Sequence, residues 1–187
     1  MLTLGTLTAV SALEHPELLA TPVVAALREW EHSPEIGVVP IDPGLADTAA
    51  CAAAYRLPLD SGANCVVVAG KRDGQERIAA CLVRTDTRTD VNNVVKRLLD
   101  VRKCSFLSME RAVAESGMEY GGITPIGLPA GWRLLIDSRV LDIDVTVIGS
   151  GIRGSKILAP GAVLCALPRA EVIEGLAGYP ERSQGNT

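Results

Sequence analysis

Aromatic residues are scarce in this chain, since Phe, Trp and Tyr together make up 3% of its 187 residues. Apolar residues nevertheless account for 48%, so the core has to be built mainly from Val, Ile, Leu and Ala. This length suits one domain with a small N-terminal addition. No apolar run approaches the ~20 residues that a membrane-spanning helix needs. We therefore expect a globular domain with an aliphatic core and no membrane contact.

Paired cysteines and clustered metal ligands are also missing. None of the cysteines forms a C-x-x-C pair, and both histidines, His15 and His32, lie near the N-terminus. Isolated cysteines inside apolar stretches are typical of reduced core thiols in a cytosolic protein. We expect no disulfide framework, no metal site, no cofactor and no Ser-His-Asp set. The five cysteines are Cys51, Cys65, Cys81, Cys104 and Cys165.

An excess of basic residues is absent as well. The net charge is −4, and such a mildly acidic protein has no overall field that attracts nucleic acid. Any contact with nucleic acid must therefore come from a few Arg and Lys side chains on one face. The first ten residues lack the basic region of a signal peptide, so we predict a cytoplasmic location.

Helix and strand signals divide the chain into three parts. Pro16, Pro22 and the apolar spacing that follows them predict a helical lead-in over residues 1–35. Residues 36–178 mix strands with helices, and the polar residues 179–187 are expected to form a flexible tail. Strands are expected at 36–41, 64–69, 78–83, 134–136, 145–148 and 156–158. Helices are expected at 47–55, 90–100, 108–115 and 167–176.

Turn signals define the fold class. Asp73-Gly74 lies between two apolar strands and predicts a tight hairpin. Hairpins mixed with helices predict an α+β fold, with a mixed, mostly antiparallel sheet or barrel-like core and flanking helices.

A glycine-rich loop follows the expected strand at 145–148. Gly149, Gly151 and Gly154 spell G-x-G-x-x-G, the pattern of a dinucleotide-binding turn. That motif requires a helix directly afterwards, but Pro160 ends any helix here, and only 33 residues remain after Gly154. We therefore favour a loop whose N–H groups, with Arg153 and Lys156, contact a phosphate. A plain glycine turn with two solvated cations is the alternative.

A second loop, Gly121-Gly122-Ile123-Thr124-Pro125, combines two glycines with a proline. Glycine permits positive φ and close approach of the backbone to a ligand, and Pro125 stiffens the far end. Such a loop can present carbonyl and N–H groups to an amino group or an ester oxygen. A tight structural turn is the alternative reading of the same residues.

These residues carry a resemblance to a known family. Gly121 to Pro125 resembles the G-x-x-x-P loop of the YbaK/ProX aminoacyl-tRNA editing domains, which also occur as an insertion in bacterial prolyl-tRNA synthetases. The run from Leu134 to Asp137 resembles the family's strand and aspartate, and Val147 to Gly154 resembles its glycine loop. The order of the expected elements from residue 36 to about 177 is similar too.

The resemblance implies a deacylase that acts in trans. Members of the family cleave the ester between a wrong amino acid and the 3′-terminal adenosine of tRNA, usually a small amino acid on tRNA(Pro). A synthetase is a further partner that the resemblance implies, with no metal or other cofactor. The backbone from Gly121 through Gly122, Ile123 and Thr124 to Pro125 would orient the amino acid, and Thr124 would donate to an ester oxygen. Asn64 and the loop with Gly149, Ser150 and Gly151 would hold the adenosine and a water, with Arg153 and Lys156 as the nearby cations.

Two positions leave alternatives open. Asp137 would hold a ribose hydroxyl or the α-amino group, or it caps the turn at Ser138 instead. The family usually carries a lysine where this chain has Asn64, at the start of a central strand. Either Asn64 positions water or ribose by hydrogen bonds, or another cation has taken over, or hydrolysis is lost. The last case describes a catalytically silent module that binds a tRNA 3′ end, a nucleotide or a partner protein.

Overall fold

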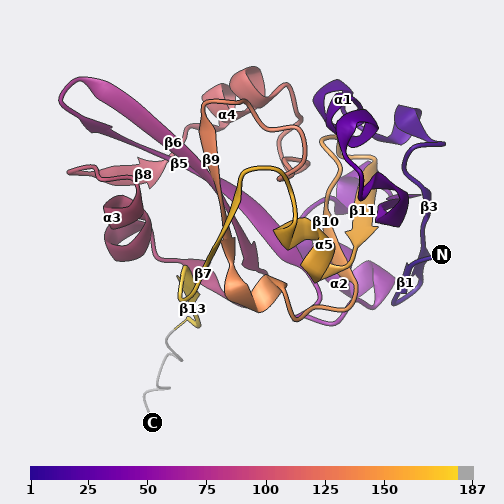
Figure 1. Cartoon of the computed structure of the whole chain (residues 1–187). Helices are drawn as coiled ribbons and strands as arrows, with labels where there is room; N and C mark the ends of the chain where they lie inside the picture. Colours follow the sequence, from indigo (N-terminus) through magenta and orange to yellow (C-terminus); the bar gives the residue numbers. More distant parts are fainter. Residues whose placement is uncertain (181–187) are drawn as a thin grey trace, which may run out of the picture.

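A computed structural model describes residues 1–180, and its largest sheet has five strands (Figure 1). The strand order is β12-β9-β6-β5-β8. β5 pairs antiparallel with β6 and with β8, whereas β9 runs parallel to both β6 and β12. The strands are β5 (Ala63–Arg72), β6 (Gln75–Arg84), β8 (Cys104–Phe106), β9 (Trp132–Asp137) and β12 (Ala170–Ile173).

A second sheet has four antiparallel strands in the order β10-β11-β4-β3. It meets the first sheet where Gly62, just before β5, bridges to Val147 in β10. The strands are β3 (Val10–Ser11), β4 (Gly37–Pro40), β10 (Thr146–Gly149) and β11 (Ser155–Ala159). The expected α+β fold with mostly antiparallel strands is confirmed. The barrel alternative is wrong, because the sheets of residues 1–180 do not close on each other.

Local signals place two helices and one hairpin as expected. Asp47 caps α2 (Thr48–Tyr55) by accepting from the N–H groups of Ala49 and Ala50. Ser108 caps α4 (Met109–Ser116), which ends at Gly117 with φ +68°. Asp73 and Gly74 both adopt positive φ in the β5–β6 turn, the conformation that a two-residue hairpin requires.

Two expected helices are wrong in part or in whole. Residues 170–173 form β12 instead of a helix, because the main chain there pairs with β9 in register from Leu134 to Asp137. Only the short α5 (Gly161–Cys165) precedes it. The helix expected at 90–100 begins as a π-type turn over Val91–Val95 and continues as α3 (Lys96–Leu98).

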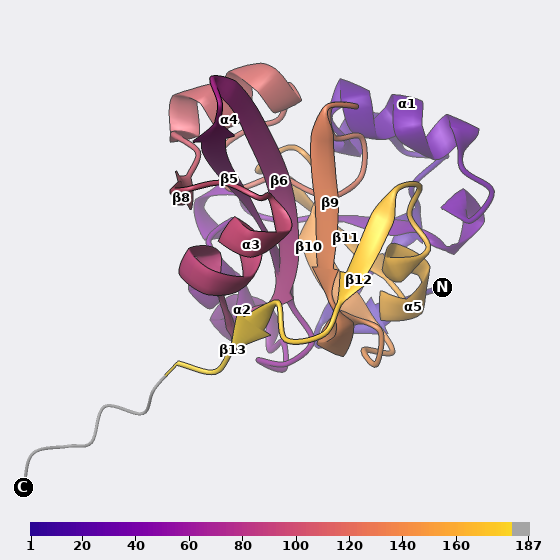
Figure 2. The ribbon, with the colours of Figure 1, turned by 60° about the vertical axis from the view of Figure 1, so that its left-hand side comes forward.

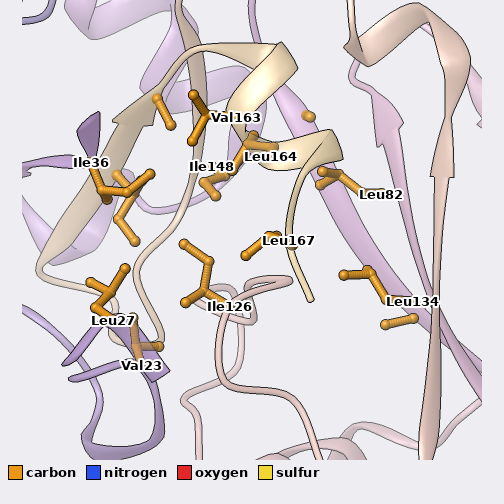
Figure 3. Packing of buried hydrophobic residues seen from close by; sticks show 14 of the residues in the cluster. Val23, Leu27, Ile36, Leu82, Ile126, Leu134, Ile148, Val163, Leu164 and Leu167 are labelled. Atoms are coloured by element: carbon orange, nitrogen blue, oxygen red, sulfur yellow. The ribbon is translucent and has the colours of Figure 1, made fainter. Parts of the chain in front are cut away.

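The N-terminal lead-in is only partly helical. Short strands β1 (Thr3–Leu4) and β2 (Leu7–Thr8) pair with each other, and β3 joins the second sheet before α1 (Thr21–Glu29) begins. The lead-in also shares the main core, since Val23 and Leu27 of α1 pack with Ile36, Ile126 and Ile148 (Figure 3). It is therefore an integral part of the domain.

Three aliphatic clusters stabilise the fold. The largest lies between the two sheets, and a second lies between the five-stranded sheet and α3. Figure 2 shows α3 on the face of this sheet that points away from the second sheet. The third lies beneath α2. The small strands β7 (Arg88–Thr89) and β13 (Ala177–Gly178) pair near the end of the described chain.

The expected tail falls partly outside the structure, since residues 181–187 are not among the described residues. Within residues 1–180, no helix is long and apolar enough to cross a membrane.

Candidate active site

A cavity of about 810 Å³ lies where the two sheets meet. Its lining comes from segments far apart in the sequence: α2 and the start of β5, β8 and α4, the loop before β9, and β10 with the loop and strand that follow it. Six residues singled out from the sequence line it together: Asn64, Gly121, Ile123, Gly149, Arg153 and Lys156. The structure therefore brings the two glycine loops and the start of β5 around one hollow.

Asn64 has a fixed orientation in this cavity. The hydroxyl of Thr48, at the first turn of α2, donates to its side-chain oxygen over 2.9 Å. The amide nitrogen of Asn64 has no hydrogen-bond partner within residues 1–180. Because Thr48 occupies the acceptor, Asn64 presents two N–H donors to the cavity.

The two glycine loops interlock through their backbones. The N–H of Gly151 donates to the carbonyl oxygen of Gly122 over 2.7 Å, and the N–H of Glu119 donates to the carbonyl oxygen of Gly151 over 2.8 Å. A Cβ at Gly149 would collide with the carbonyl oxygen of Gly122, and a Cβ at Gly122 would lie 2.8 Å from the backbone of Ile152. Close approach thus requires glycine at both positions.

Arg153 ties this pair of loops to the segment before α2. Its guanidinium donates to the carbonyl oxygens of Tyr120 (3.2 Å) and Pro43 (3.1 Å). The guanidinium also lies over Gly121, where a Cβ would come within 2.9 Å of Nη1. Arg153 is half-buried and lines the cavity, so it places a permanent positive charge in the wall.

Lys156 is the second cation of the wall. Its side chain is almost fully buried, and Nζ donates to the carbonyl oxygen of Ala46 over 3.0 Å. Burial lowers the pKa of Lys156, an effect that the neighbouring Cys51 and Asp47 partly oppose. The alternative of a solvated surface charge is therefore wrong for this residue.

The remaining surface of the cavity is mainly apolar. Aliphatic side chains form the interior, including Val67, Leu107 and Ile148. Four large apolar residues that line the cavity are more than half exposed, and so they form its mouth: Leu59, Phe106, Met109 and Tyr120. Neither Thr48 nor these residues stand out in the sequence, although Phe106 is the single Phe of the chain.

Several predicted site residues do not line the cavity. Thr124 is fully buried and its hydroxyl has no partner within residues 1–180, so it does not face an ester there. Pro125 lines a separate hollow of about 140 Å³ beside Trp30 and Trp132. Three further residues do not line the cavity and instead hold the loops together on the side away from it: Gly122, Ser150 and Gly151. The Ser150 hydroxyl bonds to Ser155 within the protein.

Asp137 is also outside the cavity. Its buried carboxylate accepts from the N–H of Arg139 and from the N–H of Ala177 over 2.8 Å. It caps the turn over Ser138–Val140, which was the alternative reading of this residue. The prediction that Asp137 holds a ribose hydroxyl or the α-amino group is wrong, because these bonds and the Arg139 guanidinium occupy its oxygens.

A comparison with models of protein families shows to which family the chain belongs. The family model of the aminoacyl-tRNA editing domain matches residues 42–164, a range that contains every residue lining the cavity. The chain belongs to the aminoacyl-tRNA editing domain family. This membership supports a deacylase-type role with aminoacyl-tRNA as substrate. A comparison with curated proteins finds no match.

Solved structures share the fold of this editing domain. A proposed trans-editing enzyme for prolyl tRNA synthetase aligns with a TM-score of 0.68 and 19% identity, over 82% of this chain and 93% of that chain. The hypothetical protein APE2540 aligns with a TM-score of 0.66 and 18% identity, over 75% and 90%. In the described part of this editing domain, no three His, Cys, Asp or Glu side chains cluster to hold a metal ion.

Proposed function

We propose that this chain is a trans-acting deacylase that hydrolyses the ester between a small amino acid and the 3′-terminal adenosine of a mischarged tRNA, with tRNA(Pro) as the first candidate. One observation carries the proposal: the N–H donors of Asn64, the interlocked glycine loops and the cation Lys156 face a single cavity. The likeness to a proposed trans-editing enzyme for prolyl tRNA synthetase supports the choice of tRNA.

The size and lining of the cavity suit this substrate. A hollow of about 810 Å³ is large enough for an amino acid linked to a ribose and part of a base. The apolar interior would take the amino-acid side chain. The N–H groups of Gly121 and Ile123 donate to no other group within residues 1–180, which leaves them for the polar atoms of the aminoacyl group.

The chemistry requires little more than positioning. A water oxygen bonds to the ester carbonyl carbon, the bond to the ribose oxygen breaks, and that oxygen leaves with a proton. Because an aminoacyl ester is already activated, holding the water and the carbonyl in line supplies much of the acceleration. Asn64 would donate to the carbonyl oxygen as negative charge develops on it, and Lys156 would add positive potential.

A silent binding module is the second candidate, and Asn64 favours it. The family usually carries a lysine at this place, and a charge-assisted hydrogen bond is roughly twice as strong as a neutral one. Without that charge, the cavity would hold a tRNA end but cleave it slowly or not at all.

A deacylation assay separates the two candidates. The substrates are tRNA(Pro) charged with Ala, Cys or Ser, and tRNA(Pro) charged with Pro is the control for specificity. A deacylase releases at least one of the small amino acids faster than Pro, and Asn64→Ala reduces this rate. Tight binding without turnover supports the silent module, and a gain of activity in Asn64→Lys would show that the missing charge is the cause.

A further inference from the structure

The surface beside the mouth of the cavity has an uneven distribution of charge. Residues 71–103 contain nine Lys and Arg but five Asp and Glu, a net charge of +4, whereas the whole chain carries −4. The rest of the chain therefore carries −8. This segment runs through the end of the β5–β6 hairpin, β6, β7, α3 and the approach to β8, and of these the hairpin end, α3 and β8 lie together at one side of the molecule (Figure 1).

Four of the five acidic residues of this segment form ion pairs with arginine, and the fifth, Asp90, accepts hydrogen bonds from Asn93. Asp100 binds both Arg72 and Arg77, and Asp73 lies 3.7 Å from Arg72. Glu76 pairs with Arg111 over 2.8 Å. Four exposed cations of β5, α3 and the approach to β8 form no ion pair within residues 1–180, and we call them the basic surface: Lys71, Arg97, Arg102 and Lys103.

Strand β8 connects the basic surface to the cavity. Gly70 of β5 lies opposite Cys104 of the antiparallel β8. Lys71, which follows Gly70, is therefore adjacent to Lys103, which precedes Cys104. Phe106 lies at the other end of β8, lines the cavity and is 62% exposed. At about 3.3 Å per residue, the Cα atoms of Lys103 and Phe106 are roughly 10 Å apart along the strand.

The opposite side of the mouth is different. Asp47 lines the cavity there, and the exposed Asp60 follows Leu59. Residues 101–108 contain no acidic residue at all. A polyanion that enters the cavity is thus repelled on the α2 side and attracted along β8.

We propose that a single RNA strand leaves the cavity over Phe106 and follows β8 to the basic surface, where Arg102 and Lys103 contact its phosphates. This inference rests on the proposed function and assigns the path of the tRNA 3′ end. An exposed aromatic ring at the cavity mouth offers a base a face on which to stack, and nearby cations neutralise the backbone.

Binding of uncharged tRNA(Pro), measured by fluorescence anisotropy at several salt concentrations, tests the path without requiring hydrolysis. The double variant Arg102→Gln with Lys103→Gln should weaken binding. It should also make the negative slope of log K against log [salt] less steep by about 1.4, since each single-strand phosphate contact contributes about 0.7. The control, Arg28→Gln with Arg169→Gln, removes two exposed charges outside residues 71–103, one in α1 and one just before β12 at the opposite edge of the sheet from β8, and should leave the slope unchanged.

Phe106 is tested in the same assay. Phe106→Leu keeps an apolar side chain but removes the ring, and should weaken binding at least about fivefold, whereas Phe106→Trp should not. Equal effects of the two charge-neutralised pairs, or no effect of Phe106→Leu, would overturn the path. The two proposals fail in different ways. If only the path is wrong, the unaltered protein still deacylates mischarged tRNA. If the proposed function is wrong, no deacylation is observed, although binding that depends on these charges can still be measured.

Discussion

Thr48 and Asn64 are joined by a hydrogen bond of 2.9 Å between the first turn of α2 and the start of β5. The bond fixes which end of the Asn64 amide faces the cavity. Thr48→Val keeps the shape of the side chain but removes the hydroxyl, so Asn64 becomes free to rotate. We expect kcat/KM for deacylation to fall about tenfold, and the free energy of unfolding to fall by only about 1 kcal/mol.

The same deacylation assay on Asn64→Asp tests the N–H donors of Asn64 themselves. It keeps an acceptor for Thr48 but replaces the N–H donors with a negative charge, so activity should fall further than in Thr48→Val. Full activity of Asn64→Asp would show that the N–H donors of Asn64 have no part in the reaction, and full activity of Thr48→Val would show that Thr48 does not need to orient them.

Gly149→Ala tests the contact between the glycine loops. The added Cβ would collide with the carbonyl oxygen of Gly122, which is backbone and cannot rotate away. We expect a loss of about 1–3 kcal/mol in the free energy of unfolding, measured by urea denaturation. The matched control is Gly131→Ala, since no atom lies within 4 Å of a Cβ there, and its stability should change by less than about 0.5 kcal/mol.

Lys156 makes stability depend on pH. Burial lowers its pKa in the folded state, so the unfolded chain binds more protons between that lowered pKa and the ordinary value of 10.5. Stability must therefore rise with pH across this window. Measured as the difference between wild type and Lys156→Met, which cancels the effect of other groups, the wild type should gain stability as pH increases toward 10.5. A difference that is constant with pH would contradict the burial of a shifted amine.

Cys65 lines the cavity but should be a poor nucleophile. Burial raises the pKa of its thiol to about 12. At pH 8 its thiolate fraction is about a thousandfold below that of an ordinary cysteine, and alkylation by iodoacetamide should be slower by a similar factor. Mass spectrometry of the alkylated protein measures the rate at each cysteine, and rapid modification of Cys65 would contradict this value.

Local chemistry explains which parts of the fold could be predicted from the sequence. Asp47, Ser108 and Gly117 act on backbone groups within three or four residues, so the ends of α2 and α4 could be read directly. β12 could not, because its four residues are held by pairing with β9, more than thirty positions earlier. The apolar spacing of such a short run is compatible with either structure.

The same distinction applies to the site. The glycine loops could be identified from the sequence because two backbones that approach closely require glycine at the positions of contact. The environment of Lys156 could not, because its acceptor is the carbonyl oxygen of Ala46, 110 positions away. The contact of Thr48 with Asn64 also joins two elements that only the folded chain brings together.

Helix α1 and its N-cap Ala20 precede the matched range 42–164, yet they contact the second glycine loop and the chain just after the first. Ala20 and Val23 lie against Gly151, and backbone atoms of Pro22 lie against Gly127, two residues beyond Pro125, where larger residues would not fit. The unit that must fold for activity is therefore wider than the range the family shares. A shortened protein that begins at residue 42 would keep every cavity-lining side chain and still lose the support that holds them in place.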